Sequence, residues 1–229
     1  MCGRYAITID PVTLAEHFGI ELSGVIVHAA PSFNIAPTQE VPIVRMDLPA
    51  QISIAKWGLI PSWSKDPAIG AKLINARSET ITEKPSFRTA FKKRRCLVLA
   101  DGFYEWQKFP NGKSKKPMFI QLKTGRPFAM AGLYEFWKPA EPNTTTGWVT
   151  SCTIITTAAN SFMQPVHDRM PVFLPSGAEV VWLDPSASEP ELTRLFEPYP
   201  SDLLVMHEVS PRVNTYRNND ADLVRPVDD

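Results

Sequence analysis

Residues 95–106, RCLVLADGFYEW, join two runs of β-forming residues through Asp101 and Gly102. Similar runs recur along the chain: VPIVR (41–45), QISIAKWGL (51–59), PMFIQL (117–122), PFAMAGLYEFW (127–137), WVTSCTIITT (148–157) and LLVMHEVS (203–210). Turn-forming clusters separate them, notably PNGK (110–113) and KTGRP (123–127), and the second is typical of a hairpin connection. We therefore predict one α+β domain dominated by a strongly curved antiparallel sheet.

A few short helices accompany these strands. In DPVTLAEHFG (10–19), Asp10 is placed to cap a helix, Pro11 to open it and Gly19 to end it. Two further helices are predicted in PSFRTAFKKR (85–94) and in SEPELTRLFEP (188–198), where Ser188 can act as the cap.

The composition sets limits on the class of protein. The chain has 229 residues, of which 44% are hydrophobic, and formal net charge of zero, so any anion-binding site must be local. We predict a single domain over residues 1–229, with residues 215–229 as a loose acidic tail. An odd number of widely spaced cysteines indicates a reduced, cytosolic chain without a disulfide framework, and no apolar run suits a signal peptide or a membrane span.

Cys2 raises a chemical question because it follows the initiator methionine directly. Removal of Met1 would leave a residue with an α-amine and a thiol on adjacent carbons, with ordinary pKa values of about 7.7–8.0 and about 8.5. Free cysteines are also among the most buried residue types, so a packed core position is the alternative. The position alone does not decide between them.

Two polar islands interrupt apolar surroundings. LINARSET places Asn75, Arg77 and Glu79 after an apolar stretch. Asn75 is either a catalytic residue or the N-cap of a helix. In ADGFYEWQ, strand alternation puts Glu105 on the same face as Phe103. A carboxylate on an apolar face has a raised pKa and suits proton transfer, whereas on an exposed edge strand it has no such role.

QPVHDRMP (164–171) gathers His167, Asp168 and Arg169 between two prolines. Histidine suits proton transfer near neutral pH and arginine suits phosphate, while an ordinary surface loop is the alternative. In WGLIPSW, we expect Trp57 in the core and Trp63 on the surface.

The sequence predicts neither a metal nor a cofactor. The four histidines stand apart and no cysteine pair has metal-ligand spacing. Phosphate-binding, dinucleotide-binding, zinc-protease and nucleophile-elbow motifs are absent from the sequence as well.

Taken together, the motifs resemble the SOS-response-associated peptidase family, the abasic-site-processing proteins. The matching stretches occur in family order from residue 2 to about residue 214: MCGRY, FNIAPTQ, WGLIPSW, INARSET, RCLVLADGFYEW, PMFI, TTAAN, HDRMPV and VSPRVN. The resemblance implies a curved, barrel-like sheet and a positively charged groove for single-stranded DNA.

Site residues follow from the same resemblance. It implies that Cys2 is the nucleophile that becomes linked to DNA, and that Asn75, Glu105 and His167 complete the catalytic set. It also implies that arginines hold DNA phosphates and that an aromatic side chain borders the DNA, at Arg4, Arg77, Arg169 and Trp63. One departure is Ser64, where some relatives have a second tryptophan.

The implied function is detection of abasic sites in single-stranded DNA and their covalent capture as a thiazolidine on Cys2. An N-terminal-nucleophile peptidase or amidohydrolase, which could itself remove Met1, and a non-covalent reader of modified bases remain alternatives. We expect a monomer that binds abasic single-stranded DNA and no membrane. Its expected location is the cytoplasm, at the nucleoid when bound to DNA, or the nucleus of a eukaryote.

Overall fold

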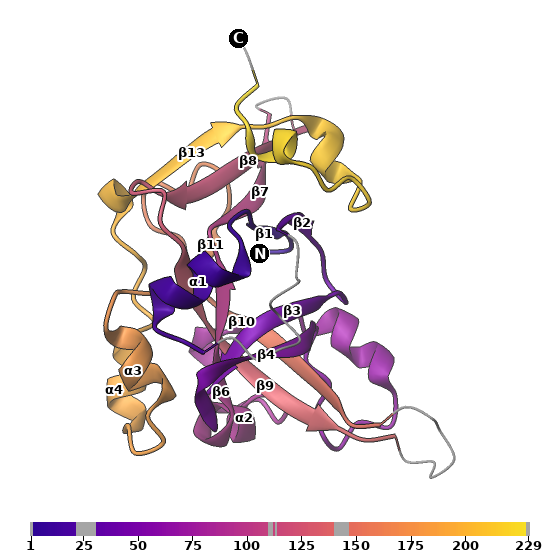
Figure 1. Cartoon of the computed structure of the whole chain (residues 1–229), viewed down its shortest axis with the longest axis vertical. Helices are drawn as coiled ribbons and strands as arrows, with labels where there is room; N and C mark the ends of the chain where they lie inside the picture. Colours follow the sequence, from indigo (N-terminus) through magenta and orange to yellow (C-terminus); the bar gives the residue numbers. More distant parts are fainter. Residues whose placement is uncertain (1, 22–30, 110–111, 113, 140–146, 228–229) are drawn as a thin grey trace.

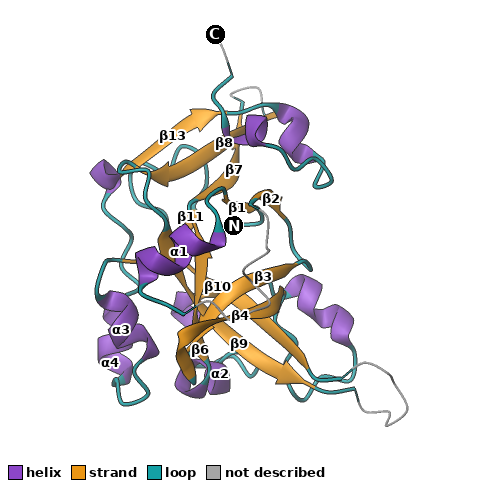
Figure 2. Cartoon of the chain, viewed as in Figure 1, coloured by secondary structure: helices purple, strands orange, loops and turns teal. Residues whose placement is uncertain are grey.

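The computed structural model describes residues 2–21, 31–109, 112, 114–139 and 147–227, and Figure 1 shows their arrangement. The named strands form an eight-stranded and a five-stranded sheet, with short helices around them (Figure 2). The strands are β1 (Tyr5–Ile7), β2 (Ser32–Ile35), β3 (Glu40–Arg45), β4 (Leu48–Trp57), β5 (Asn75–Arg77), β6 (Arg95–Ala100), β7 (Gly102–Lys108), β8 (Lys115–Leu122), β9 (Phe128–Trp137), β10 (Val149–Ala158), β11 (Arg169–Pro171), β12 (Phe173–Leu174) and β13 (Leu204–Glu208).

The larger sheet closes on itself. Its order is β11-β10-β4-β3-β6-β9-β12, and β10 also pairs with β9, so that β6, β3, β4, β10 and β9 form a closed barrel. Most pairings are antiparallel, but β10 runs parallel to both β4 and β5. The predicted α+β fold with a curved, barrel-like sheet is confirmed, with these parallel pairs as an addition.

The stretch 95–106 connects the two sheets. Its first run is β6, in the barrel, and its second run is β7, which lies between β1 and β8 in the five-stranded sheet. Both runs are buried over most of their length, with Leu99 and Phe103 fully buried. At the junction, Asp101 Oδ2 accepts hydrogen bonds from the Thr8 amide at 2.6 Å and the Thr8 hydroxyl at 2.7 Å, which fixes the start of the chain against the turn.

The helices are α1 (Pro11–Phe18), α2 (Arg88–Lys93), α3 (Ala178–Leu183) and α4 (Glu189–Arg194). Short 3-10 helices are Pro67–Lys72, Ser78–Thr80, Ser201–Leu203, Pro211–Asn214 and Ala221–Val224. The three predicted helices are confirmed: Asp10 caps α1, Gly19 ends it at φ 62°, and Ser188 and Glu191 form a capping box on α4. The helix α3 was not predicted.

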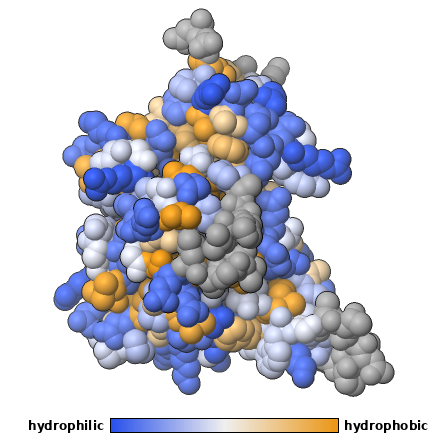
Figure 3. All heavy atoms as spheres, viewed as in Figure 1, coloured by the Kyte–Doolittle hydropathy of each residue, from blue (hydrophilic) through white to orange (hydrophobic). Residues whose placement is uncertain are grey.

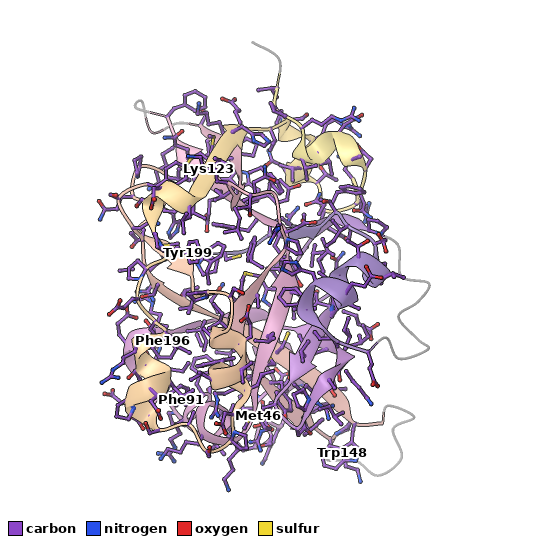
Figure 4. All side chains as sticks on the ribbon, turned by 60° about the vertical axis from the view of Figure 1, so that its left-hand side comes forward. Met46, Phe91, Lys123, Trp148, Phe196 and Tyr199 are labelled. Carbon is purple, nitrogen blue, oxygen red and sulfur yellow. The ribbon has the colours of Figure 1, made fainter. Side chains whose placement is uncertain are left out.

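Buried Arg95 attaches α2 and α3 to the barrel. Its Nε donates to the Trp182 carbonyl at 2.7 Å and its Nη1 to the Phe91 carbonyl at 2.9 Å. Phe91 also packs against Phe196, with ring centroids 6.0 Å apart, and both lie at the same end of the molecule in Figure 4. An arginine at the start of β6 is therefore structural, with its charge satisfied by backbone carbonyls.

Two sequence predictions are wrong. KTGRP does not close a hairpin, because β8 pairs with β7 and β13 whereas β9 pairs with β6, β10 and β12 in the other sheet. The segment 215–227 is not loose, because Leu223 is fully buried and the Asn219 side chain accepts a hydrogen bond from the Phe33 amide at 2.7 Å. Packing against β2 thus orders a segment whose composition is that of a tail. The PNGK turn lies largely outside the described residues.

The hydropathy of the surface and the length of the helices also bear on the sequence predictions. On the face shown in Figure 3, hydrophobic residues lie scattered among hydrophilic ones. Among the described residues, every helix is too short or too polar to span a bilayer.

Candidate active site

Strand β10 aligns three of the predicted residues. Its parallel pairing with β5 sets Ile154 opposite Asn75 and Thr156 opposite Arg77. On the other side, its antiparallel pairing with β11 sets Ala158 opposite Arg169. Residues separated by more than 90 positions in the chain therefore gather around one strand end.

Cys2 lies where this strand end meets the five-stranded sheet. It is fully buried and precedes β1, whose chain is fixed to β7 by a hydrogen bond of 2.9 Å from the Tyr104 amide to the Arg4 carbonyl. Glu105 is the next residue of β7, so Asn75 from the larger sheet and Glu105 from the five-stranded sheet both act on Cys2.

Asn75 binds the backbone of Cys2 directly. Its Nδ2 donates to the Cys2 carbonyl at 2.8 Å, and its Oδ1 is buried without a hydrogen-bond partner among the described residues. A buried acceptor of this kind is costly unless something donates to it. Asn75 lies in β5 and the 3-10 helix after it begins at Ser78, so the helix-cap alternative is wrong.

Glu105 is buried, with 4% of its surface exposed, and shares its face with Phe103 as predicted. Because β7 is flanked by β1 and β8, the alternative of an exposed edge strand is wrong. Burial raises the pKa of Glu105 from 4.5 to about 7, although the positive charge of Lys115 opposes the rise. At neutral pH this carboxyl group can therefore either donate or accept a proton.

The Cys2 thiol is protonated in this environment. Burial is the main cause that raises its pKa, and the negative charge of Glu105 adds to the rise. The Glu105 carboxyl group and the Cys2 thiol therefore influence each other's charge. Burial, which sequence reasoning treated as an alternative to chemistry, here accompanies a neighbouring proton acceptor.

His167 is held as a neutral ring. Burial lowers its pKa, and the neighbouring Asp168 carboxylate, 2.8 Å from Nδ1, opposes that effect. The Arg169 amide donates to Nδ1 at 2.9 Å, on the same nitrogen that Asp168 contacts, so both neighbours fix the orientation of the ring. The charge of Lys115 acts on His167 and on Glu105, consistent with both residues facing one region.

The arginines predicted to bind phosphate differ in how free their side chains are to contact an anion. The Arg77 side chain is exposed at the rim of the strand end. Arg169 instead forms a two-point ion pair with Glu79, at 2.5 and 3.0 Å, and its side chain is only 11% exposed.

Arg4, two residues after Cys2, is held by contacts with β2 and with the C-terminal part of the chain. Its Nη1 donates to Asn34 Oδ1 at 2.6 Å and to the Val213 carbonyl at 2.8 Å, and its guanidinium lies 5.8 Å from the centre of the Trp106 ring. Asn34 is 2% exposed, and its amide also donates to the carbonyls of the turn after residue 213. Sequence reasoning missed Asn34, for which the signal was a polar side chain between two apolar residues of β2.

The remaining aromatic predictions hold, since Trp57 is fully buried and Trp63 is 60% exposed. A cavity of about 780 Å³, lined in part by Met46, Phe173 and Tyr199, contains none of the candidate residues. Figure 4 labels Tyr199 and Met46 on its wall.

The family model described as SOS response associated peptidase (SRAP) matches residues 1–216, a range that contains every candidate residue. The chain belongs to the SRAP family. The resemblance drawn from the motifs is thereby confirmed.

Several SRAP relatives have names that describe their substrate. Abasic site processing protein YoqW of Bacillus subtilis is 42% identical over 226 residues, which is 98% of this chain and 99% of the relative. Abasic site processing protein HMCES of Pongo abelii is 34% identical over 238 residues, covering 86% of this chain and 66% of the relative.

The SRAP fold also has solved examples. A protein from Bacteroides thetaiotaomicron matches with a TM-score of 0.89 at 27% identity, covering 99% of this chain and 100% of that one. A protein from Bordetella bronchiseptica matches with a TM-score of 0.76 at 28% identity, covering 91% of this chain and 100% of that one.

Proposed function

We propose that this SRAP protein captures abasic sites in single-stranded DNA by covalent attachment to Cys2. The observation that supports this most is the position of Cys2: Asn75 holds its carbonyl at 2.8 Å, and Glu105, with a pKa of about 7, acts on its thiol. The names of the relatives point to the same lesion.

The proposed reaction balances without a cofactor. An abasic sugar in its open form presents an aldehyde, which the α-amine of Cys2 attacks to give an imine with loss of one water. The thiol then adds to the same carbon and its proton passes to the nitrogen, which closes a five-membered thiazolidine. Because the second step is intramolecular, its effective molarity can reach about 10⁵ M or more, and the adduct is more durable than an imine.

This chemistry requires that Met1 be removed, because an amine in a peptide bond cannot form an imine. Met1 lies outside the described residues. Retention of any residue before Cys2 should therefore abolish capture while leaving the fold intact.

The surrounding residues have distinct proposed roles. Glu105 takes the proton of the amine or thiol and returns it to the departing water, for which a pKa of about 7 is well matched. His167, oriented through Nδ1 by the Arg169 amide and Asp168, protonates or polarises the sugar oxygen as the ring opens. The buried Oδ1 of Asn75 accepts a hydrogen bond from the free amine and orients it.

DNA binding in this proposal uses the rim of the site. Arg77 and Arg4 hold flanking phosphates, and exposed Trp63 stacks on a base at the border of the groove. We expect the protein to act as a monomer, in the compartment that contains the DNA.

The test is incubation of the protein with single-stranded oligonucleotides, followed by a denaturing gel. We expect a denaturant-resistant complex with an abasic oligonucleotide, and none with undamaged DNA or with an abasic site whose aldehyde has been reduced. Binding that is lost on denaturation would instead indicate a non-covalent reader. Cleavage of a peptide amide without any DNA complex would indicate a peptidase.

A further inference from the structure

Glu79 occupies the face of Arg169 that a phosphate would use. Arg169 Nη1 donates to Glu79 Oε1 at 2.5 Å and Nη2 donates to Glu79 Oε2 at 3.0 Å. Nη2 also donates to the Thr156 carbonyl at 2.5 Å. This parallel two-point geometry is the one by which arginine grips the oxygens of a phosphate.

The remaining donors of Arg169 do not suffice for a second anion. A guanidinium has five N–H groups. Both hydrogens of Nη2 and one of Nη1 have the acceptors named above. The Nε atom is buried without a hydrogen-bond partner among the described residues, so a single Nη1 hydrogen is left for an incoming group.

We propose that Glu79 competes with DNA phosphate for Arg169 and so determines how tightly the site holds a single strand. The inference rests on the proposed function, because it presumes that DNA binds at this strand end. A phosphate gains two-point contact with Arg169 only when the Glu79 carboxylate turns away. Glu79 is able to turn, since its side chain is 52% exposed and it belongs to a 3-10 helix of only three residues.

Arg77 differs from Arg169 in being available to DNA without first losing a partner, and this difference makes the competition selective for well-placed DNA. Arg77 lies opposite Thr156 on β10, the residue whose carbonyl accepts from Arg169, yet the Arg77 side chain is exposed. A single-stranded DNA can therefore bind Arg77 at once. Arg169 exchanges the Glu79 carboxylate only for a phosphate that the other contacts have already positioned. A free anion, or a DNA strand that is poorly placed, is not positioned in this way and leaves the ion pair between Arg169 and Glu79 intact.

The experiment measures affinity for a single-stranded oligonucleotide that contains a tetrahydrofuran abasic analogue, which has no aldehyde and cannot crosslink. Glu79→Gln should tighten binding about two- to five-fold at low salt, the range expected for loss of a partly exposed ion pair. Glu79→Asp retains the charge but shortens the side chain, and should give a smaller gain in the same direction.

Glu83→Gln is the matched control, because it removes the same charge from an exposed residue four positions away. It should change affinity less than Glu79→Gln. In an Arg169→Gln background, Glu79→Gln should give no gain beyond that control, because its effect passes through Arg169.

Three results would contradict competition between Glu79 and phosphate. The first is an equal gain in DNA affinity from Glu79→Gln and Glu83→Gln, the second is weaker DNA binding by Glu79→Gln, and the third is a gain in affinity that persists in the Arg169→Gln background. If Arg169→Gln weakens binding while Glu79→Gln changes nothing, the inference fails and the proposed function stands. If no variant alters DNA binding and no abasic complex forms, the proposed function fails as well.

Discussion

Glu105 on β7 and Glu135 on β9 are both buried glutamates on central strands, exposed by 4% and 6% respectively. Glu135 has a cation beside it: Arg94 Nη2 lies 2.8 Å from its Oε2, and the Phe136 amide donates to its Oε1 at 2.9 Å. Glu105 lies beside the Cys2 thiol, and burial raises its pKa to about 7. The same residue at similar burial is thus structural in one sheet and suited to proton transfer in the other.

The difference shows that burial alone does not identify a catalytic carboxylate. Arg94 directly follows α2, so the ion pair attaches that helix to the barrel. At Glu105 the neighbouring strands are β1 and β8, and the group it acts on is the thiol of Cys2, the proposed nucleophile. Burial raises the pKa of Glu105 to about 7, so this carboxyl group can exchange a proton near neutral pH, whereas the ion pair with Arg94 gives Glu135 a structural role.

The largest expected effect is on stability, at the structural carboxylate. Arg94→Ala leaves Glu135 buried without its cation and should lower the free energy of unfolding by about 3 kcal/mol. Arg225→Ala breaks an exposed pair with Asp222 and should cost less than about 1 kcal/mol. Chemical denaturation of both variants checks the contrast, and equal losses would remove the distinction between the two environments.

The second effect is the pH dependence that Glu105 gives to stability. Its pKa is higher in the folded chain, about 7, than its ordinary 4.5, so the folded state binds the proton more tightly. Its contribution is fully present below pH 4.5 and is lost as the pH rises through 7, a change of up to about 3 kcal/mol. When the free energy of unfolding is measured by chemical denaturation from pH 4.5 to 8, Glu105→Gln should gain stability relative to the parent as the pH rises. A difference in stability that does not change with pH would contradict the raised pKa.

A third effect separates the two glutamates by reaction rate. Glu105→Gln keeps the shape but removes proton transfer, and should slow single-turnover crosslinking about 100-fold. Glu135→Gln should leave that rate within about three-fold, because both oxygens of Glu135 already have partners, Arg94 and the Phe136 amide. Affinity for the tetrahydrofuran oligonucleotide should be unchanged in Glu105→Gln; a loss confined to affinity would make this residue part of the binding surface instead.

The smallest effect concerns charge at the surface. Arg77→Ala removes an exposed cation and should reduce the slope of log affinity against log salt by about 0.7 for single-stranded DNA. Arg88→Ala removes another exposed cation, on α2, and should leave the slope unchanged. A slope unaffected by Arg77→Ala would place the DNA elsewhere.

Local sequence signals predicted the local structure well. Asp10 and Gly19 determine the ends of α1, and runs of β-forming residues located the main strands, because capping and strand propensity depend on near neighbours. The KTGRP turn was misassigned, since a turn does not reveal that its two flanking strands belong to different sheets.

Predictions about the site were limited in the same way. Strand alternation gave the face of Glu105 but could not show that β7 has a neighbour on each side. The pairing of Arg169 with Glu79 spans 90 positions, and only the register of β5, β10 and β11 brings the two together. The order in residues 215–227 likewise depends on β2, which is distant in sequence.

The most direct test of the account is the intact mass of the protein before and after reaction with an abasic single-stranded oligonucleotide. The account predicts a reactive species that lacks Met1, and an adduct whose mass is the sum of that protein and the DNA minus one water. Cys2→Ser should give no comparable adduct that survives heating without reductant. An adduct of the same yield on protein that retains Met1, or on Cys2→Ala, would contradict capture through the amine and thiol of Cys2.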